Sequence, residues 1–205
     1  MNMPKPLLII INGPPGAGKT TLAQRLSGDL RLPVLHRDGI AETLFDGLDC
    51  PTHGRPVLFG PASFKLLHYF AGSLLAVGQS LIVEGSFYNS ALASEEFLQL
   101  KQSYDFEPLQ IQCKADGAVL LARFLARADM PERHICHRDF EFAERNKSLF
   151  QQGRLTNLAL GGQIIEIDTT DVHTYDYTDL LQEIRSILLD ADHSVESANS
   201  SSPTT

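Results

Sequence analysis

The chain of 205 residues has no tryptophan, only three cysteines and no long apolar run. A membrane-spanning helix needs about 18 consecutive apolar residues, and no segment of the sequence approaches that length. The cysteines Cys50, Cys113 and Cys136 are odd in number and widely spaced. This spacing favours reduced thiols in a cytoplasm over a disulfide framework. We therefore expect a cytoplasmic protein that does not enter a membrane.

Basic residues are also scarce, with 17 Lys and Arg against 25 Asp and Glu, for a formal net charge of −8. A chain of this sign is not a general binder of polyanions, so nucleic acid would require a local basic surface. Six of the eleven arginines fall within residues 123–154. That cluster is either such a surface or a solvated helical face.

Short apolar runs of strand length alternate with amphipathic stretches. Strands are expected at 7–12, 33–37, 80–83, 107–114 and 163–168, and helices at 19–30, 38–48, 63–77, 94–103, 138–152 and 178–189, with a further helix capped by Asp116 and ending near 128. Ser63 is expected to cap its helix, Glu95 and Glu96 to lie in a first turn, and the residues 49–62 to form a loop. This alternation predicts an α/β fold with a parallel sheet that is covered on both faces.

The sequence predicts a single domain over residues 1–190. Residues 191–205 consist mainly of Ser, Thr, Asn and acidic residues and have almost nothing to bury. We therefore expect them to form a disordered tail.

The most specific motif is G-x-x-x-x-G-K-[ST], which residues 13–20 match completely between an expected strand and an expected helix. In such a loop the backbone N–H groups wrap a phosphate chain, and the following helix points its positive end at the same anion. The motif predicts a nucleotide site built from Gly13, Pro14, Pro15, Gly16, Ala17, Gly18, Lys19, Thr20 and Thr21. Lys19 would meet the β- and γ-phosphates, and the Thr20 hydroxyl would bind Mg²⁺.

Further motifs follow in a characteristic order: Arg37-Asp38 after the second strand, LIVEG at 81–85, R-x-x-x-R from Arg123, and RH-x-x-H-x-D from Arg133. Over residues 7–170 this sequence resembles a family of small P-loop kinases. The family includes the 5′-kinase domain of polynucleotide kinases, chloramphenicol phosphotransferase and the zeta-toxin kinases. The resemblance implies a three-layer αβα P-loop NTPase fold, with a five-stranded, mainly parallel sheet in the order 2-3-1-4-5. It also implies a mobile helical lid over the nucleotide.

Asp38 is the leading candidate for a general base, since phosphoryl transfer uses a carboxylate that orients the acceptor hydroxyl and accepts its proton. The resemblance places that carboxylate directly after the second strand, where Asp38 stands. The competing interpretation is a helix N-cap for the residues that follow. Arg37 precedes Asp38 as in the polynucleotide kinases, but Ala41 replaces the basic residue that those enzymes carry one turn later, which weakens a nucleic-acid interpretation.

Glu84 ends an apolar strand at the position where P-loop enzymes carry an acid that holds Mg²⁺ or its waters. A helix cap is the alternative, and Glu84 also competes with Asp38 for the role of base. The expected metal site is therefore Thr20 with Glu84. Because Gly13, Asp38 and Glu84 each follow an expected strand, they should converge on one edge of the sheet.

The arginines of residues 123–152 are expected to belong to the lid. Arg123 and Arg127 share one helical face because they are four residues apart, and the resemblance implies that lid arginines contact the phosphates and that one stacks on the adenine. We expect Arg123 and Arg127 to bind nucleotide, and Arg127 and Arg133 to neutralise charge during transfer. The H-x-C-H group at 134–137 lacks the further ligands of a structural zinc site, so no metal is expected there.

The sequence thus favours an enzyme that uses ATP and Mg²⁺ to phosphorylate a hydroxyl of a small molecule, with Lys19, Asp38, Arg127 and Arg133 as its catalytic residues. A polynucleotide 5′-hydroxyl kinase is the nearest alternative, and the net charge and Ala41 argue against it. A nucleotide-hydrolysing switch ATPase is the second alternative. The acceptor and the oligomeric state are left open.

Overall fold

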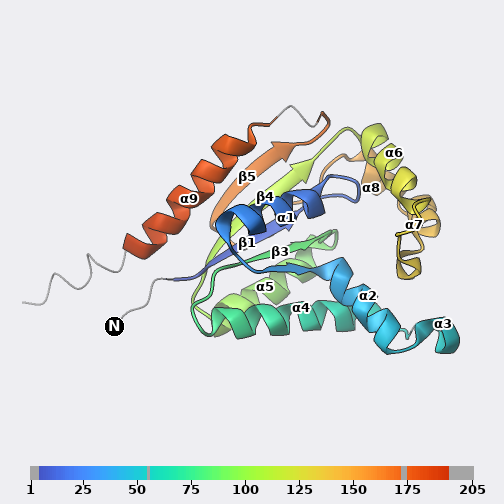
Figure 1. The fold of residues 1–205 in the computed structure, drawn as a ribbon, viewed down its shortest axis with the longest axis horizontal. Helices are drawn as coiled ribbons and strands as arrows, with labels where there is room; N and C mark the ends of the chain where they lie inside the picture. Colours follow the sequence, from blue (N-terminus) through green and yellow to red (C-terminus); the bar gives the residue numbers. More distant parts are fainter. Residues whose placement is uncertain (1–4, 55, 172–174, 194–205) are drawn as a thin grey trace, which may run out of the picture.

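A computed structural model describes residues 5–54, 56–171 and 175–193. Five parallel strands form one sheet in the order β2-β3-β1-β4-β5 (Figure 1). The strands are β1 Leu7–Asn12, β2 Val34–His36, β3 Leu81–Gly85, β4 Glu107–Lys114 and β5 Gln163–Asp168. The predicted fold class and strand order are confirmed.

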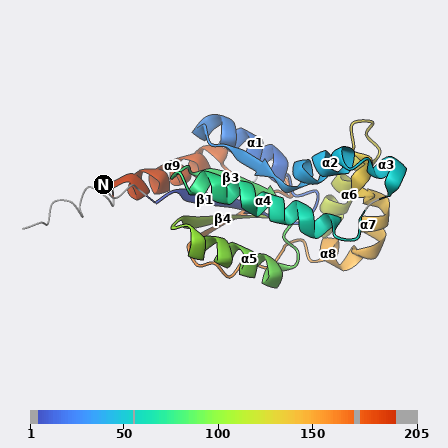
Figure 2. The ribbon, with the colours of Figure 1, turned by 90° about the horizontal axis from the view of Figure 1, so that it is seen from below.

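Helices cover both faces of the sheet and give the three layers (Figures 1 and 2). One face packs against α1 Lys19–Leu30, α6 Gly117–Ala128 and α9 Tyr177–His193, and the other against α4 Phe59–Leu75 and α5 Ser90–Ser103. The remaining elements gather at one end of the molecule: α2 Arg37–Gly47, α3 Cys50–His53, the 3₁₀ turn η1 Ile135–His137, α7 Asp139–Arg145 and α8 Lys147–Gln151.

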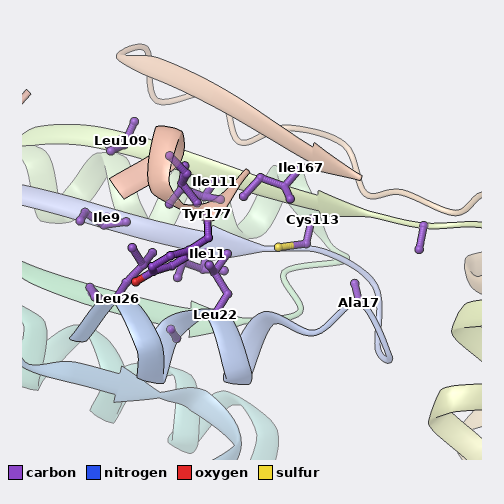
Figure 3. Packing of buried hydrophobic residues seen from close by; sticks show 14 of the residues in the cluster. Ile9, Ile11, Ala17, Leu22, Leu26, Leu109, Ile111, Cys113, Ile167 and Tyr177 are labelled. Carbon is purple, nitrogen blue, oxygen red and sulfur yellow. The ribbon is translucent and has the colours of Figure 1, made fainter. Parts of the chain in front are cut away.

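The core explains why β1 has an uninterrupted apolar sequence. Its side chains alternate between the two faces, with Ile9 and Ile11 toward α1 and α9, and Leu8 and Ile10 toward α4 and α5; all four are fully buried. Figure 3 shows Ile9 and Ile11 packed among side chains of α1, β4 and α9. A strand buried on both faces needs apolar residues at every position, so a continuous run replaces alternation.

The region between α2 and α4 differs from the prediction. Residues 49–62 were expected to form a loop, but they contain the short helix α3, and α4 begins at Phe59. Ser63 therefore lies inside α4 and does not cap it. Its hydroxyl donates to the Gly60 carbonyl at 2.8 Å, a bond within the helix that a serine also makes at interior positions.

The start of α5 was also predicted too late. The helix begins at Ser90, and the Asn89 side chain accepts from the Leu92 N–H at 3.3 Å as its cap. Glu95 and Glu96 consequently lie beyond the first turn, so the prediction that they belong to that turn was wrong. Glu96 instead pairs with Lys65 of α4 at 2.8 Å.

Two further boundaries need correction. The helix expected over 138–152 is two helices, α7 and α8, separated at Asn146. Helix α9 continues to His193, so residues 191–193 of the expected tail are helical, and the rest of that tail lies outside the described residues. Within the described ranges, no helix is long and apolar enough to cross a membrane.

The strand register brings the expected site residues together. His36 is the neighbour of Glu84, and Asn12 is the neighbour of Gly85. The carboxyl ends of β1, β2 and β3 therefore meet at one edge of the sheet. Three segments begin at that edge: the phosphate-binding loop, helix α2 and residues 86–89.

Candidate active site

The loop after β1 has a shape that only glycine permits at two positions. A Cβ at Gly13 would lie 2.3 Å from the Cys113 carbonyl oxygen, and a Cβ at Gly16 would lie 2.5 Å from the Leu120 carbonyl oxygen. Gly16 also has a φ of +84°, which other residues adopt only with strain. The backbone of β4 and of α6 thus contacts the loop directly and leaves no room for a side chain at Gly13 or Gly16.

Helix α1 begins at Lys19, directly after the loop. Gly18 is its N-cap, and no side chain caps the first turn. The N–H groups of that turn are suited to an anion because the positive end of the helix dipole lies there. The Lys19 ammonium donates to the Pro14 carbonyl at 2.9 Å, so the side chain folds back across the loop.

A cleft of about 240 Å³, the central cleft, opens over this loop. Four cations and three carboxylates line it: Lys19, Arg37, Arg127, Arg133, Asp38, Glu84 and Asp139. Cations thus outnumber carboxylates here, although the chain as a whole carries a net charge of −8. A cleft with this balance suits a polyphosphate.

The loop residues divide between the cleft and the core. Among the predicted nucleotide-binding residues, Pro15, Gly16, Gly18, Lys19, Thr20 and Thr21 line the central cleft. Gly13, Pro14 and Ala17 do not line it. Ala17 is fully buried and belongs to the core cluster shown in Figure 3. These three residues shape the loop through their backbone.

Asp38 lies in the first turn of α2, and its side chain is 51% exposed. The N-cap of α2 is His36, so Asp38 is not the cap that the alternative interpretation assigned to it. Partial desolvation in the cleft would raise the pKa of the Asp38 carboxyl, but the charges of His137, Lys19, Arg37 and Arg133 outweigh it and hold that pKa below its usual value. The carboxylate is therefore ionised at neutral pH.

Glu84 lies beside Thr20, as the predicted metal site requires. The Thr20 hydroxyl donates to Glu84 Oε2 at 3.3 Å, and His36 Nδ1 lies 3.1 Å from the same oxygen. Mg²⁺ is usually bound by one or two protein oxygens together with substrate phosphates and waters. A buried carboxylate next to a threonine hydroxyl, at the mouth of a phosphate loop, fits that ion.

The Lys19 ammonium has an unusual environment. Burial lowers its pKa below the usual value, and the negative charges of Glu84 and Asp38 act in the opposite direction. A phosphate entering the cleft would add negative charge beside this amine. The nearby carboxylates therefore do not fully offset the cost of burying the Lys19 charge.

Arg127 and Arg133 both reach the central cleft. Arg127 Nε is buried and has no hydrogen-bond partner among the described residues, and burial lowers the pKa of the guanidinium. Arg133 instead makes a bidentate pair with Asp139 through Nε and Nη2. Arg127 thus keeps an unsatisfied donor for a ligand, while Arg133 has a fixed orientation.

Arg123 lies outside the lining of the cleft. Its guanidinium donates to the carbonyls of Thr169 and Thr170 at 2.7 and 3.1 Å and so fastens the segment after β5 to α6. Its predicted contact with nucleotide stays a prediction.

Both ends of the predicted lid, residues 123–152, are anchored in the core by Phe124 and Phe150, which are buried in the same cluster. Between these anchors lie η1 and α7. Exposed apolar side chains occur in η1 (Ile135), in α7 (Phe140) and in the turn that precedes η1 (Met130).

Sequence reasoning missed the contacts of the histidines. His134 Nε2 lies 3.1 Å from Asp46 Oδ1, and His137 Nε2 lies 2.6 Å from Glu42 Oε1. Glu42 and Asp46 are four residues apart and share one face of α2, a spacing that the sequence displays. No signal in the sequence joins that face to histidines about ninety residues away.

The AAA domain family matches residues 8–146, which is more than half of the chain. The chain belongs to the AAA domain family. A search of the curated proteins found no match. This AAA domain protein is similar to the crystal structure of a candidate kinase from Chloroflexus aurantiacus J-10-fl, at 34% identity and a TM-score of 0.78, over 93% of this chain and 100% of that one.

More distant structures share the fold. A sugar kinase from Janibacter sp. HTCC2649 is 15% identical with a TM-score of 0.55, over 92% of this chain and 96% of that one. A gluconokinase from Sinorhizobium meliloti 1021 is 13% identical with a TM-score of 0.51, over 96% of this chain and 98% of that one. The AAA domain protein therefore has a P-loop kinase fold. The narrower resemblance to polynucleotide kinases, chloramphenicol phosphotransferase and zeta-toxin kinases stays a prediction.

Proposed function

We propose that this protein is a kinase that uses ATP and Mg²⁺ to phosphorylate a hydroxyl group of a small molecule. One observation carries the proposal: Lys19, which suits the phosphate donor, and Asp38, which suits the acceptor, line the same cleft. Asp38 is ionised and is not occupied as a helix cap. A carboxylate in this position can orient the hydroxyl group of an alcohol acceptor and accept its proton.

In this proposal the backbone of residues 13–20 and the Lys19 ammonium hold the β- and γ-phosphates. Thr20 and Glu84 hold Mg²⁺, which when bound neutralises phosphate charge. Arg127 and Arg133 face the outer oxygens of the transferred group, where charge is spread in the transition state. The cleft would thus stabilise the transferring group from several sides.

Asp38 supplies the proton acceptor. The acceptor oxygen forms a bond to the γ-phosphorus as its proton passes to an Asp38 carboxylate oxygen. The bond between the γ-phosphorus and the β–γ bridging oxygen breaks, and its electrons leave with ADP. A base with a lowered pKa is fully ionised at neutral pH, which favours positioning of the hydroxyl over strong proton abstraction.

A small-molecule acceptor agrees with the charge of the chain. The net charge of −8 opposes a polynucleotide, and Ala41 lines the cleft where the polynucleotide kinases carry a basic residue. The sugar kinase and gluconokinase that share this fold are named for small hydroxyl-bearing substrates.

The test is a screen for ADP release that depends on an added acceptor. The panel contains sugar acids, ring-bearing alcohols and oligonucleotides with a free 5′-hydroxyl, each with ATP and Mg²⁺. We expect slow ADP release without an acceptor and a large increase with one class of small alcohol. Brisk release without any acceptor would instead support a switch ATPase, and stimulation by oligonucleotides alone would support a polynucleotide kinase.

A further inference from the structure

A second cavity of about 270 Å³, the side cavity, adjoins the central cleft. The two share Arg37, Ser86 and Tyr88 in their walls. The other walls come from the start of α4, from residues 86–89 and from α5. The two cavities are therefore neighbours, and Arg37 lies between them.

The walls of the side cavity are mostly apolar. Phe64 and Phe87 are in contact, with ring centroids 5.8 Å apart and ring planes inclined at 51°, and Leu92, which is 49% exposed, forms part of the rim. Lys65 and Glu96 are paired with each other. An apolar guest gains by leaving water against this largely apolar wall, whereas a polyol would find few groups there to replace its hydrogen bonds to water.

The cavity is held in shape before any ligand enters. The Phe87 N–H donates to the fully buried Asn12 side chain at 2.9 Å, which ties residues 86–89 to β1. A Cβ at Gly85 would lie 3.0 Å from the Phe87 ring and 3.2 Å from Arg37 Cβ. The wall and the shared arginine are therefore packed tightly against the end of β3.

The position of the cavity relates it to the proposed base. Arg37 and Asp38 are consecutive in the first turn of α2, with Arg37 Nη1 3.9 Å from Asp38 Oδ1. Arg37, in the wall of the side cavity, is thus the direct neighbour of Asp38, which lines the central cleft. A cavity of about 150 Å³ is enough for a benzene ring, so 270 Å³ accepts a ring with short substituents.

We propose that the side cavity holds the apolar, ring-bearing part of the phosphate acceptor and directs its hydroxyl to Asp38. This inference rests on the proposed kinase function and narrows it. The acceptor class is a ring-bearing alcohol, in contrast to the polyhydroxy acids that a gluconokinase is named for.

The test compares two tryptophan substitutions on α5. Leu92→Trp fills the side cavity from its rim, and Leu98→Trp is the matched control, because Leu98 is 39% exposed on the same helix but lines a different surface. Binding of 2-phenylethanol and of gluconate is measured by ligand-observed NMR on the full chain with Mg²⁺ and a non-hydrolysable ATP analogue. This readout does not depend on turnover.

We expect 2-phenylethanol to bind the parent and Leu98→Trp equally and Leu92→Trp at least tenfold more weakly. Affinity for the ATP analogue should be the same in all three proteins. Equal binding of 2-phenylethanol to Leu92→Trp and the parent, or tighter binding of gluconate than of 2-phenylethanol to the parent, overturns the inference.

Turnover separates this inference from the proposed function. If ring-bearing alcohols bind but no alcohol in the screen receives phosphate, the proposed function fails and the acceptor role fails with it. If polyols receive phosphate and Leu92→Trp leaves that transfer unchanged, the assignment of the side cavity alone is overturned.

Discussion

Asp38→Asn distinguishes a catalytic role of Asp38 from a structural one, because the substitution keeps the shape of the side chain and removes its charge. Asp38 interacts with the positive end of α2, which is worth about 0.3–1 kcal/mol at an exposed position. Its contact with Arg37 at 3.9 Å is partly exposed and adds at most about 1 kcal/mol. Since Asp38 is not the N-cap, no capping bond is lost. The free energy of unfolding should therefore fall by at most about 2 kcal/mol.

The effect on transfer should be far larger. A positioned base contributes about two to four decades in rate, which is roughly 2.7–5.4 kcal/mol in the barrier at 1.36 kcal/mol per decade. Affinity for ATP should not weaken, because removing a carboxylate from a phosphate cleft removes a repulsion.

The assay measures kcat with the acceptor found in the screen, nucleotide affinity by calorimetry, and unfolding by denaturant. Asp105→Asn is the control, because Asp105 is exposed and pairs with Lys5 away from the cleft. Transfer at near-parental kcat would refute the base role and make Glu84 the next candidate. Early melting with a proportional loss of activity would show that Asp38 is structural.

Four further predictions follow from the same geometry. Lys19→Ala should lower kcat by two decades or more, about 3 kcal/mol, whereas Lys5→Ala should leave kcat unchanged. A kcat of Lys19→Ala within threefold of the parent would show that the loop is not part of the active site. Hydrogen exchange over residues 129–142 should slow when an ATP analogue and Mg²⁺ bind. Identical exchange rates in both states would show that this segment does not act as a lid. In carboxyl NMR titrations without nucleotide, the pKa of Asp38 should lie below its usual value of 3.8. The contribution of Asp38 to stability is therefore present above pH 3.8 and is lost as the pH falls through the lowered pKa. His137→Ala should raise this pKa, and a pKa above 3.8 in the parent would contradict the charge balance. Burial raises the pKa of the Cys113 thiol to about 12, so mass spectrometry should find it unalkylated at about pH 8 in the folded protein and alkylated after unfolding.

The family resemblance together with local sequence signals predicted most of the fold. The apolar run of β1 and the glycine pattern of residues 13–18 locate the first strand and the phosphate loop, because backbone geometry depends on residues adjacent in the chain. Asp116 caps α6 as expected, accepting from the N–H groups of Ala118 and Val119. The strand order came from the resemblance, since alternation alone indicates a parallel sheet without ordering it.

Helix starts were the weaker part of the prediction. Ser63 and Glu95 have residue types that suit a first turn, but both lie inside their helices. The apolar side of α4 already begins at Phe59, which is buried against α2 and the lid. Burial by distant elements thus extended α4 beyond the boundary that local propensity indicates, whereas α5 begins earlier because Asn89 caps it.

The amino-acid sequence was enough to predict a phosphate loop and candidate acids after neighbouring strands. Which of these side chains meet is visible only in the folded protein. The fold placed His36 against Glu84, His137 against Glu42, and Arg37 at the junction of two cavities. Such pairings join residues dozens of positions apart, and their charges interact through distance and burial, which the order of residues along a chain does not specify.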